Sequence, residues 1–147
     1  MKNLSKLSER LQEMLFHKNI KASALAKLLN VSPSTVTRYL REETLPSFDS
    51  LVKMLDIFNC SADFLIGLID FTPENVIYRP IPPFCERFRA IMKERRMSQY
   101  ALHNKTMLSY DNFNQWLKGN TSPYVDNLIK LAEAFECSVD YLIGHIS

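Results

Sequence analysis

Residues 24–40 read ALAKLLNVSPSTVTRYL, and this stretch decides the fold. Its leucines recur at the spacing of one face of an amphipathic helix, which starts near Ala22. Asn30 tolerates the left-handed backbone conformation that a tight turn requires. Ser32 then has the residue type of a helix N-cap, and the proline after it suits a first helical position because its missing N–H costs nothing there. The stretch therefore predicts two short helices joined by a tight turn.

The sequence on either side predicts three more helices. Before the turn, apolar residues at three- and four-residue steps indicate an amphipathic helix that Asn19 ends. After it, Ser47 and Ser61 are the expected N-caps of a fourth and a fifth helix. The fifth helix is expected to bury three side chains, Phe64, Leu65 and Leu68. No segment alternates as a strand does, so the fold class is predicted to be all-α.

The same pattern occurs twice in the chain. A shift of 77 positions aligns Leu7–Asp70 with Phe84–Ser147 without a gap. The agreement is best where CSADFLIG at 60–67 is aligned with CSVDYLIG at 137–144. Self-similarity at a fixed period indicates a repeated structural unit. We therefore predict one five-helix domain over 1–70 and a second over 84–147.

Residues 71–83 are predicted to link the two domains. They contain four of the seven prolines, which restrict φ and favour an extended, stiff spacer. Ile77 and Tyr78 are more apolar than a solvated linker needs. We therefore expect part of the segment to pack on a domain or on a second chain.

The composition is that of an ordinary globular protein. Apolar residues make up 46% and charged residues 23% of its 147 residues. The longest apolar stretch, Phe64–Ile69, is far shorter than the roughly 20 residues that span a bilayer, and the start shows no secretory signal. The three cysteines are too far apart for a CxxC site, and Cys60 and Cys137 are expected to be packed inside. We expect a cytoplasmic protein that does not bind a membrane.

No pattern in the sequence points to catalysis. There is no set of nucleophile, base and acid, and no glycine-rich phosphate loop in a chain with three glycines. The three histidines are scattered, which disfavours a metal site. We therefore expect no enzyme activity, no metal or other cofactor, and no small-molecule ligand.

The charge excludes a strongly basic binding protein. The chain carries 18 basic and 16 acidic residues, a net charge of +2, and a split at residue 70 gives +1 to each half. Any contact with a nucleic acid must therefore come from the local placement of charge rather than from bulk charge.

The helices expected over 33–41 and 110–118 have outward faces that suit such a contact. In the first helix the outward positions are polar and none is acidic: Ser34, Thr37, Arg38 and Arg41. Arg38 can donate two hydrogen bonds to a guanine edge. In the second helix the same positions are Asp111, Asn114, Gln115 and Lys118. The amides suit adenine and the lysine suits phosphate, and the second helix after a tight turn is the element that enters the major groove in helix-turn-helix proteins.

An ordered set of short motifs resembles the lambda-repressor-like (Cro/XRE) helix-turn-helix family. In the first unit these are ALA at 24–26, NVS at 30–32, VTR at 36–38 and the segment 60–67. In the second unit they include NQWLKG at 114–119 and the segment 137–144. The resemblance covers both units. It implies a compact five-helix bundle and sequence-specific binding of double-stranded DNA in bacterial or phage transcription control.

The DNA contacts expected from the outward faces and from the family pattern fall on both units. In the first they are Lys21, Pro33, Ser34, Thr35, Thr37, Arg38 and Arg41. In the second they are Gln99, Tyr110, Asn112, Asn114, Gln115 and Lys118. Gln99 matches a glutamine that commonly opens the second helix of family members and contacts DNA.

Several positions depart from the family pattern. Where the second unit has Gln99, the first has Ala22. The family's turn glycine is Asn30 in the first unit but Met107 in the second, and methionine is poorly suited to a left-handed conformation. His103 stands where the family has a small residue.

An alternative function follows from the acidic residues. Glu42 and Glu43 follow the third helix of the first unit, where carboxylates would repel a phosphate backbone, and the net charge is near zero. One or both units could therefore be a protein-interaction or dimerisation module that no longer binds DNA, and the chain could form a homodimer.

Overall fold

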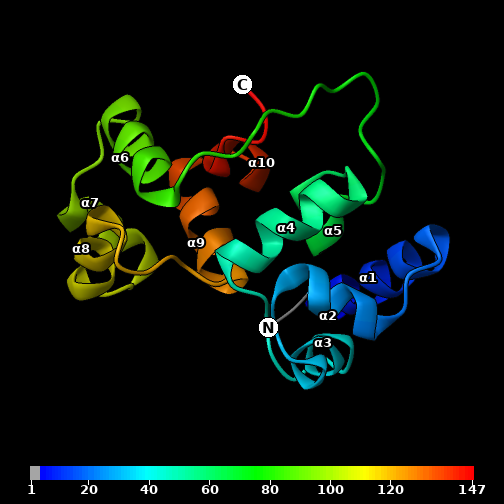
Figure 1. The fold of residues 1–147 in the computed structure, drawn as a ribbon. Coiled ribbons are helices and arrows are strands. Elements are labelled where there is room, and N and C mark those ends of the chain that lie inside the picture. Colours follow the sequence, from blue (N-terminus) through cyan, green and yellow to red (C-terminus); the bar gives the residue numbers. More distant parts are fainter. Residues whose placement is uncertain (1–3) are drawn as a thin grey trace. The chain divides into compact units, whose positions relative to one another are not determined.

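The computed structural model describes residues 4–147, and every regular element in that range is a helix (Figure 1). The fold class is therefore all-α, as predicted. The chain divides between Asn75 and Val76 into two compact units, each with five helices. None of the helices within residues 4–147 is long and apolar enough to cross a membrane.

The first unit contains the two short helices and the turn that the sequence predicts. Its helices are α1 (Leu4–Lys18), α2 (Ala22–Leu29), α3 (Pro33–Leu40), α4 (Phe48–Phe58) and α5 (Ala62–Ile66). The predicted N-caps are confirmed, because the side chains of Ser32, Ser47 and Ser61 each accept a hydrogen bond from the backbone N–H three residues on. Asn19 and Asn30 follow α1 and α2 with left-handed φ values of 55° and 58°.

The core of the first unit takes fully buried side chains from all five helices: Leu11, Leu25, Val36, Leu51 and Leu65. The prediction that Leu68 is buried with them is wrong, because its side chain is 37% exposed. α5 ends at Ile66, and the left-handed Gly67 changes the direction of the chain. Leu68 therefore does not continue the buried face of that helix. Phe64, also expected inside, is half-buried.

The second unit is built around aromatic side chains. Its helices are α6 (Phe84–Glu94), α7 (Gln99–Thr106), α8 (Tyr110–Lys118), α9 (Val125–Phe135) and α10 (Val139–Ile143). The fully buried Phe88 lies at the centre, with ring centroids of four neighbours 5.4 to 6.4 Å away: Phe84, Phe113, Trp116 and Phe135. Cys60 of the first unit is buried as predicted, whereas its counterpart Cys137 is only half-buried.

Arg10 and Arg87 occupy equivalent positions in the two units and make similar contacts. The Arg10 guanidinium donates to the backbone carbonyls of Phe64 and Ile69 and lies over the Phe64 ring, 4.0 Å from its centroid. Arg87 donates to the carbonyls of Tyr141 and of the residue after it, at 2.7 and 3.1 Å. The last carbonyls of a helix have no partner within the helix. Arg87 therefore satisfies two carbonyls in the last turn of α10, and Arg10 satisfies one carbonyl of α5 and one beyond its end.

Replacing Arg87 with methionine should destabilise the second unit, because two helix-end carbonyls lose a charged donor. We expect Arg87→Met to lower the free energy of unfolding by about 2 kcal/mol. Trp116, the only tryptophan, is buried in this unit, so the urea dependence of its fluorescence reports the change. Lys93→Met, on an exposed site of the same helix, is the matched control and should change stability by less than about 0.5 kcal/mol. Equal stability of the two variants would contradict this role for Arg87.

The turn between α7 and α8 contains two departures from the family pattern that compensate each other. Met107 has a left-handed φ of 63° despite its side chain, and its N–H donates to the carbonyl of His103 at 2.7 Å. The His103 ring donates through Nδ1 to the carbonyl of Leu108 at 2.7 Å, and the N–H of Leu108 donates to the Thr106 hydroxyl at 3.1 Å. These hydrogen bonds hold the turn in place, although methionine is poorly suited to the left-handed conformation that it adopts there.

Met107→Gly should stabilise the second unit, because glycine adopts a positive φ without steric cost. Relief of about 1–2 kcal/mol of strain is partly offset by about 0.5–1 kcal/mol of extra freedom in the unfolded chain. We expect a net gain of roughly 0.5–1 kcal/mol in the urea unfolding followed by Trp116 fluorescence. The control is Met107→Ala, which keeps the strain and should show no gain. A loss of stability in the glycine variant would mean that the exposed methionine side chain itself contributes.

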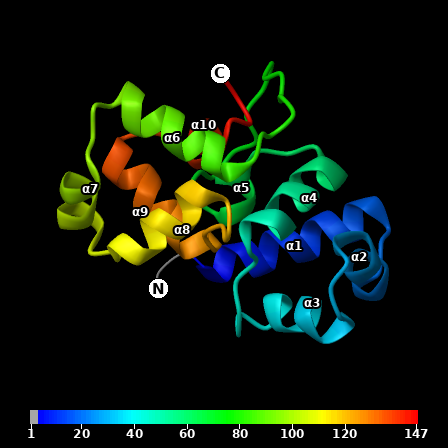
Figure 2. The same ribbon diagram turned by 60° about the vertical axis from the view of Figure 1, so that its left-hand side comes forward.

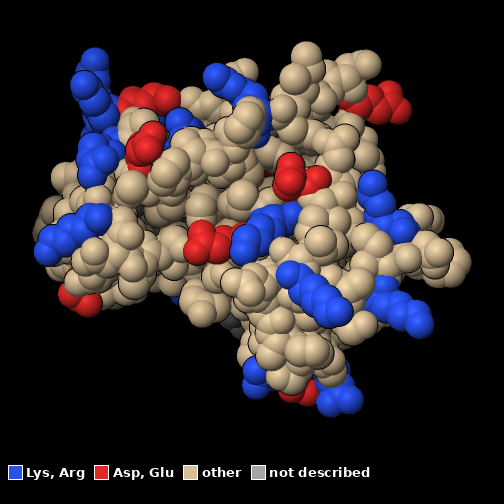
Figure 3. All heavy atoms as spheres, in the orientation of Figure 1, with Lys and Arg blue, Asp and Glu red and all other residues tan. Residues whose placement is uncertain are grey.

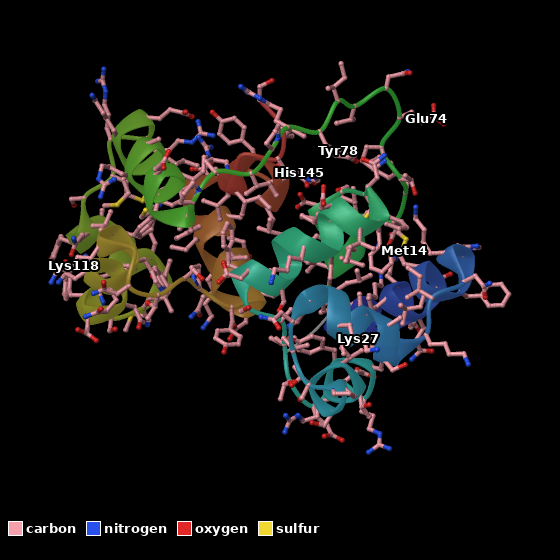
Figure 4. All side chains as sticks on the ribbon, viewed as in Figure 1. Met14, Lys27, Glu74, Tyr78, Lys118 and His145 are labelled. Atoms are coloured by element: carbon pink, nitrogen blue, oxygen red, sulfur yellow. The ribbon has the colours of Figure 1, made fainter. Side chains whose placement is uncertain are left out.

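Part of the proline-rich segment packs on the second unit, as expected. The Tyr78 ring stacks on the His145 ring with centroids 4.2 Å apart, and the N–H of Arg79 donates to the His145 carbonyl at 2.9 Å (Figure 4). His145 is buried, and its Nδ1 lies 2.8 Å from a carboxylate oxygen of Asp140. Ile77 is not part of this contact and is 87% exposed.

Candidate nucleic-acid interface

In the first unit, one side of α3 packs against the core and the opposite side is exposed. Val36 and Tyr39 are buried and anchor the helix against the core, where α2 lies beside it (Figures 1 and 2). Residues on the opposite side point away from the core: Ser34 and Arg38 are exposed, and Thr37 is partly exposed. The helix ends at Leu40, so Arg41 is its exposed C-cap rather than its last residue.

The hydroxyl groups on this side of α3 are already hydrogen-bonded within the helix. The Ser32 hydroxyl lies 3.0 Å from that of Ser34 and 2.8 Å from that of Thr35. The Thr37 hydroxyl donates to the Pro33 carbonyl at 3.1 Å. These contacts fix the first turn of α3, and the bond from Thr37 uses the single donor of its hydroxyl. Pro33 is exposed but offers no N–H.

The charged side chains of the predicted set, in contrast, are uncommitted. Lys21, Arg38 and Arg41 are exposed, and none has an ion-pair or hydrogen-bond partner for its side chain among residues 4–147. Figure 3 shows basic atoms at the α3 end of the first unit, with a few acidic atoms beside them. The free donors of this face are therefore cationic.

Glu42 and Glu43 continue the chain directly after α3 without neutralising these cations. Glu42 has a left-handed φ of 64°, where the second unit has Gly119 with a φ of 77°. The N–H of Glu43 donates to the Arg38 carbonyl at 2.9 Å. Both carboxylates are exposed, and within the described part of the chain neither forms an ion pair with Arg38 or Arg41.

In the second unit, α8 has the same orientation relative to its own core. The Ser109 side chain caps the helix by accepting from the N–H of Asn112 at 3.1 Å. Phe113 and Trp116 are buried, which turns the remaining positions outward. The exposed ones are Tyr110, Asp111, Asn114 and Lys118, and the half-buried ones are Asn112 and Gln115. Lys118 lies at the outer end of α8 (Figure 4).

Amide groups are paired across this face of the second unit. Gln99 at the start of α7 donates through Nε2 to Oδ1 of Asn114 on α8 at 3.2 Å, so two predicted residues from different helices meet. Asn120 donates to the Gln115 carbonyl oxygen at 2.9 Å. Asn120 is absent from the predicted set, although its place directly after Gly119 brings the chain back towards α8. A free donor and a free acceptor remain on each amide pair.

Two further side chains shape this face and were not found from sequence. His103 stacks on Tyr110 with ring centroids 4.7 Å apart, which fixes the orientation of the tyrosine. Arg89 on α6 donates to the Leu117 carbonyl at 2.8 Å, near the end of α8. The sequence shows that Arg89 lies two residues after Arg87 in the same expected helix. It does not show the contact, because the Leu117 carbonyl is 28 residues away in the chain.

Nothing in this region resembles a metal centre. Within residues 4–147 no three His, Cys, Asp or Glu side chains are grouped so that they could hold a metal ion. The face of each unit offers cationic and amide donors instead.

Comparison with known proteins matches both units to the same kind of domain. A helix-turn-helix family model matches residues 11–65, and a model described as a Cro/C1-type HTH DNA-binding domain matches residues 87–147. Repressor protein C2 of Salmonella phage P22 is 38% identical over 58 residues, which are 40% of this chain and 27% of the phage protein. The match thus spans about a quarter of that relative's length. A solved structure of a transcriptional regulator from Listeria innocua aligns with 21% identity and a TM-score of 0.42, over 76% of this chain and 94% of that one.

The family models cover the helix-turn-helix of each unit, including the serine caps and the outward faces of α3 and α8. The resemblance inferred from short motifs is thereby confirmed. The chain belongs to the Cro/C1-type helix-turn-helix family and contains two copies of the domain in tandem.

Proposed function

We propose that the protein is a sequence-specific DNA-binding regulator of transcription that inserts α3 and α8 into the major groove. The observation that carries this proposal is the same in both units. The inner side of each helix is buried, and its outer side presents polar donors: cations without a partner on α3, and amides that keep a free donor and acceptor on α8. The name of a similar protein, a phage repressor, supports a role in gene control.

In the first unit, Arg38 is the residue proposed to read a base. Its guanidinium is exposed and free, and an arginine fork matches the N7 and O6 acceptors of guanine. Lys21 and Arg41 are proposed to bind phosphates, which positions the helix without reading sequence. The bonded hydroxyls of Ser34, Thr35 and Thr37 shape the helix start and contribute contact surface.

In the second unit, the paired amides are proposed to read bases. Asn114, oriented by Gln99, and Gln115, oriented by Asn120, present both donors and acceptors at an exposed helix face. Lys118 is proposed to bind phosphate, and Tyr110 and Asn112 lie at the start of α8, where backbone and side-chain groups approach the DNA strand. We take 1–70 and 84–147 as the two reading domains.

Arg38→Ala should weaken binding to the preferred duplex by about 1–3 kcal/mol, because a bidentate contact is lost. Fluorescence anisotropy with a labelled duplex, selected from a random pool by the unaltered protein, measures the loss. Arg38→Lys is the matched control, because it keeps the charge but not the planar fork. It should bind random-sequence DNA as the unaltered protein does and should still lose specific affinity. Full specific affinity in both variants would remove Arg38 as a reading residue.

The salt dependence of binding separates DNA recognition from the alternative of a protein-interaction module. Each phosphate contact that is lost lowers the slope of log K against log salt by about 1. We expect this reduction for Arg41→Ala and for Lys118→Ala, with nearly equal effects on all duplex sequences. If the unaltered protein does not bind mixed genomic duplex even at low salt, the protein-interaction alternative, which the exposed Glu42 and Glu43 favour, would hold instead.

A further inference from the structure

The outward sides of α3 and α8 differ from each other at each aligned position. Arg38 aligns with Gln115, Thr37 with Asn114, and Ser34 with Asp111. The N-cap serines in front of these helices, in contrast, are the same residue with the same backbone contact. The two units therefore hold their helices in the same way and present different chemistry on them.

The first face is dominated by charged hydrogen-bond donors. Arginine and lysine carry only donors, and those of this face have no partner among residues 4–147. The Thr37 hydroxyl donates its proton to the Pro33 carbonyl, and the Ser34 hydroxyl lies 3.0 Å from that of Ser32, so the free donors of this face belong to its charged side chains. A face of this kind favours a base edge with two acceptors. In the major groove that edge belongs to guanine, which shows N7 and O6.

The second face offers a donor and an acceptor side by side. The hydrogen bond from Gln99 to Asn114 leaves the Asn114 NH₂ group and the Gln99 carbonyl unused. This pair matches adenine, which shows the N7 acceptor next to the N6 donor. Tyr100, directly after Gln99, is 68% exposed, where the first unit has a serine at position 23. An apolar ring suits the methyl group of thymine.

We infer that the chain recognises a non-palindromic DNA element made of two unlike half-sites. Arg38 reads a half-site that contains a G·C pair, and the Gln99–Asn114 pair with Gln115 reads a half-site rich in A·T. This inference rests on the proposed function. Two identical reading heads related by symmetry bind an inverted repeat. Two DNA-binding domains with different outward residues, joined in one polypeptide, are not expected to prefer an inverted repeat.

The test is selection of duplexes from a random pool by the full chain, followed by sequencing. The unaltered protein should enrich two different motif blocks. Arg38→Ala should remove the preference only in the G·C block, and Asn114→Ala only in the A·T block, each with about a tenfold or greater loss of affinity. Lys93→Met serves as the control that leaves both blocks unchanged. The triple variant Ala22→Gln/Thr37→Asn/Arg38→Gln gives the first unit the counterparts of Gln99, Asn114 and Gln115, and it should replace the G·C block by an A·T-rich one.

A second measurement does not depend on any variant. The unaltered protein should bind a duplex less tightly when either block is scrambled. A duplex in which one block is replaced by a reversed copy of the other block should also bind less tightly than the selected duplex. Enrichment of an inverted repeat of one motif, enrichment of a single block, or restoration by the reversed copy would overturn the inference while leaving the proposed function intact. No enrichment, with no binding at low salt, would overturn the proposed function itself.

Discussion

Burial of one side of a short helix is the constraint on which the structure depends. Val36 and Tyr39 fix α3, and Phe113 and Trp116 fix α8, each through apolar side chains on a single face. Because an α-helix has 3.6 residues per turn, burying one face determines which residues point outward. The serine cap at the start of each helix then satisfies a backbone N–H that would otherwise be unpaired. The polar face is thus rigidly held, which is what reading a base edge requires.

The two units reach this arrangement with different residues. The first turn is made by Asn30, which accepts a left-handed conformation, whereas the second is made by Met107 with support from His103. The two departures from the family pattern, His103 and Met107, are therefore linked. The His103 ring bonds the turn in which Met107 has a strained backbone conformation. A duplicated fold can diverge in this way because the backbone hydrogen bonds are preserved even when the side chains that make them change.

Much of the fold could be predicted from the sequence, and less of the site. The helices, the serine caps and the left-handed asparagines follow from residue types a few positions apart. The burial of Leu68 was predicted wrongly because the chain turns at Gly67, which no local periodicity reveals. The residues on the outward faces were identified, but their partners were not. Which hydroxyls are occupied and which cations are free depends on contacts that the pattern of residue types does not contain.

The sequence by itself determined the duplication, the order of the helices and the polar sides of α3 and α8, because these depend on neighbours within one or two helical turns. The tertiary structure alone decided which distant groups meet. It brought Gln99 to Asn114, Arg10 to the carbonyl of Ile69, and Tyr78 to His145. The physical reason is that a hydrogen bond or a ring contact needs a separation of a few ångströms and a suitable direction. For residues far apart in the chain, only the packed core sets that separation.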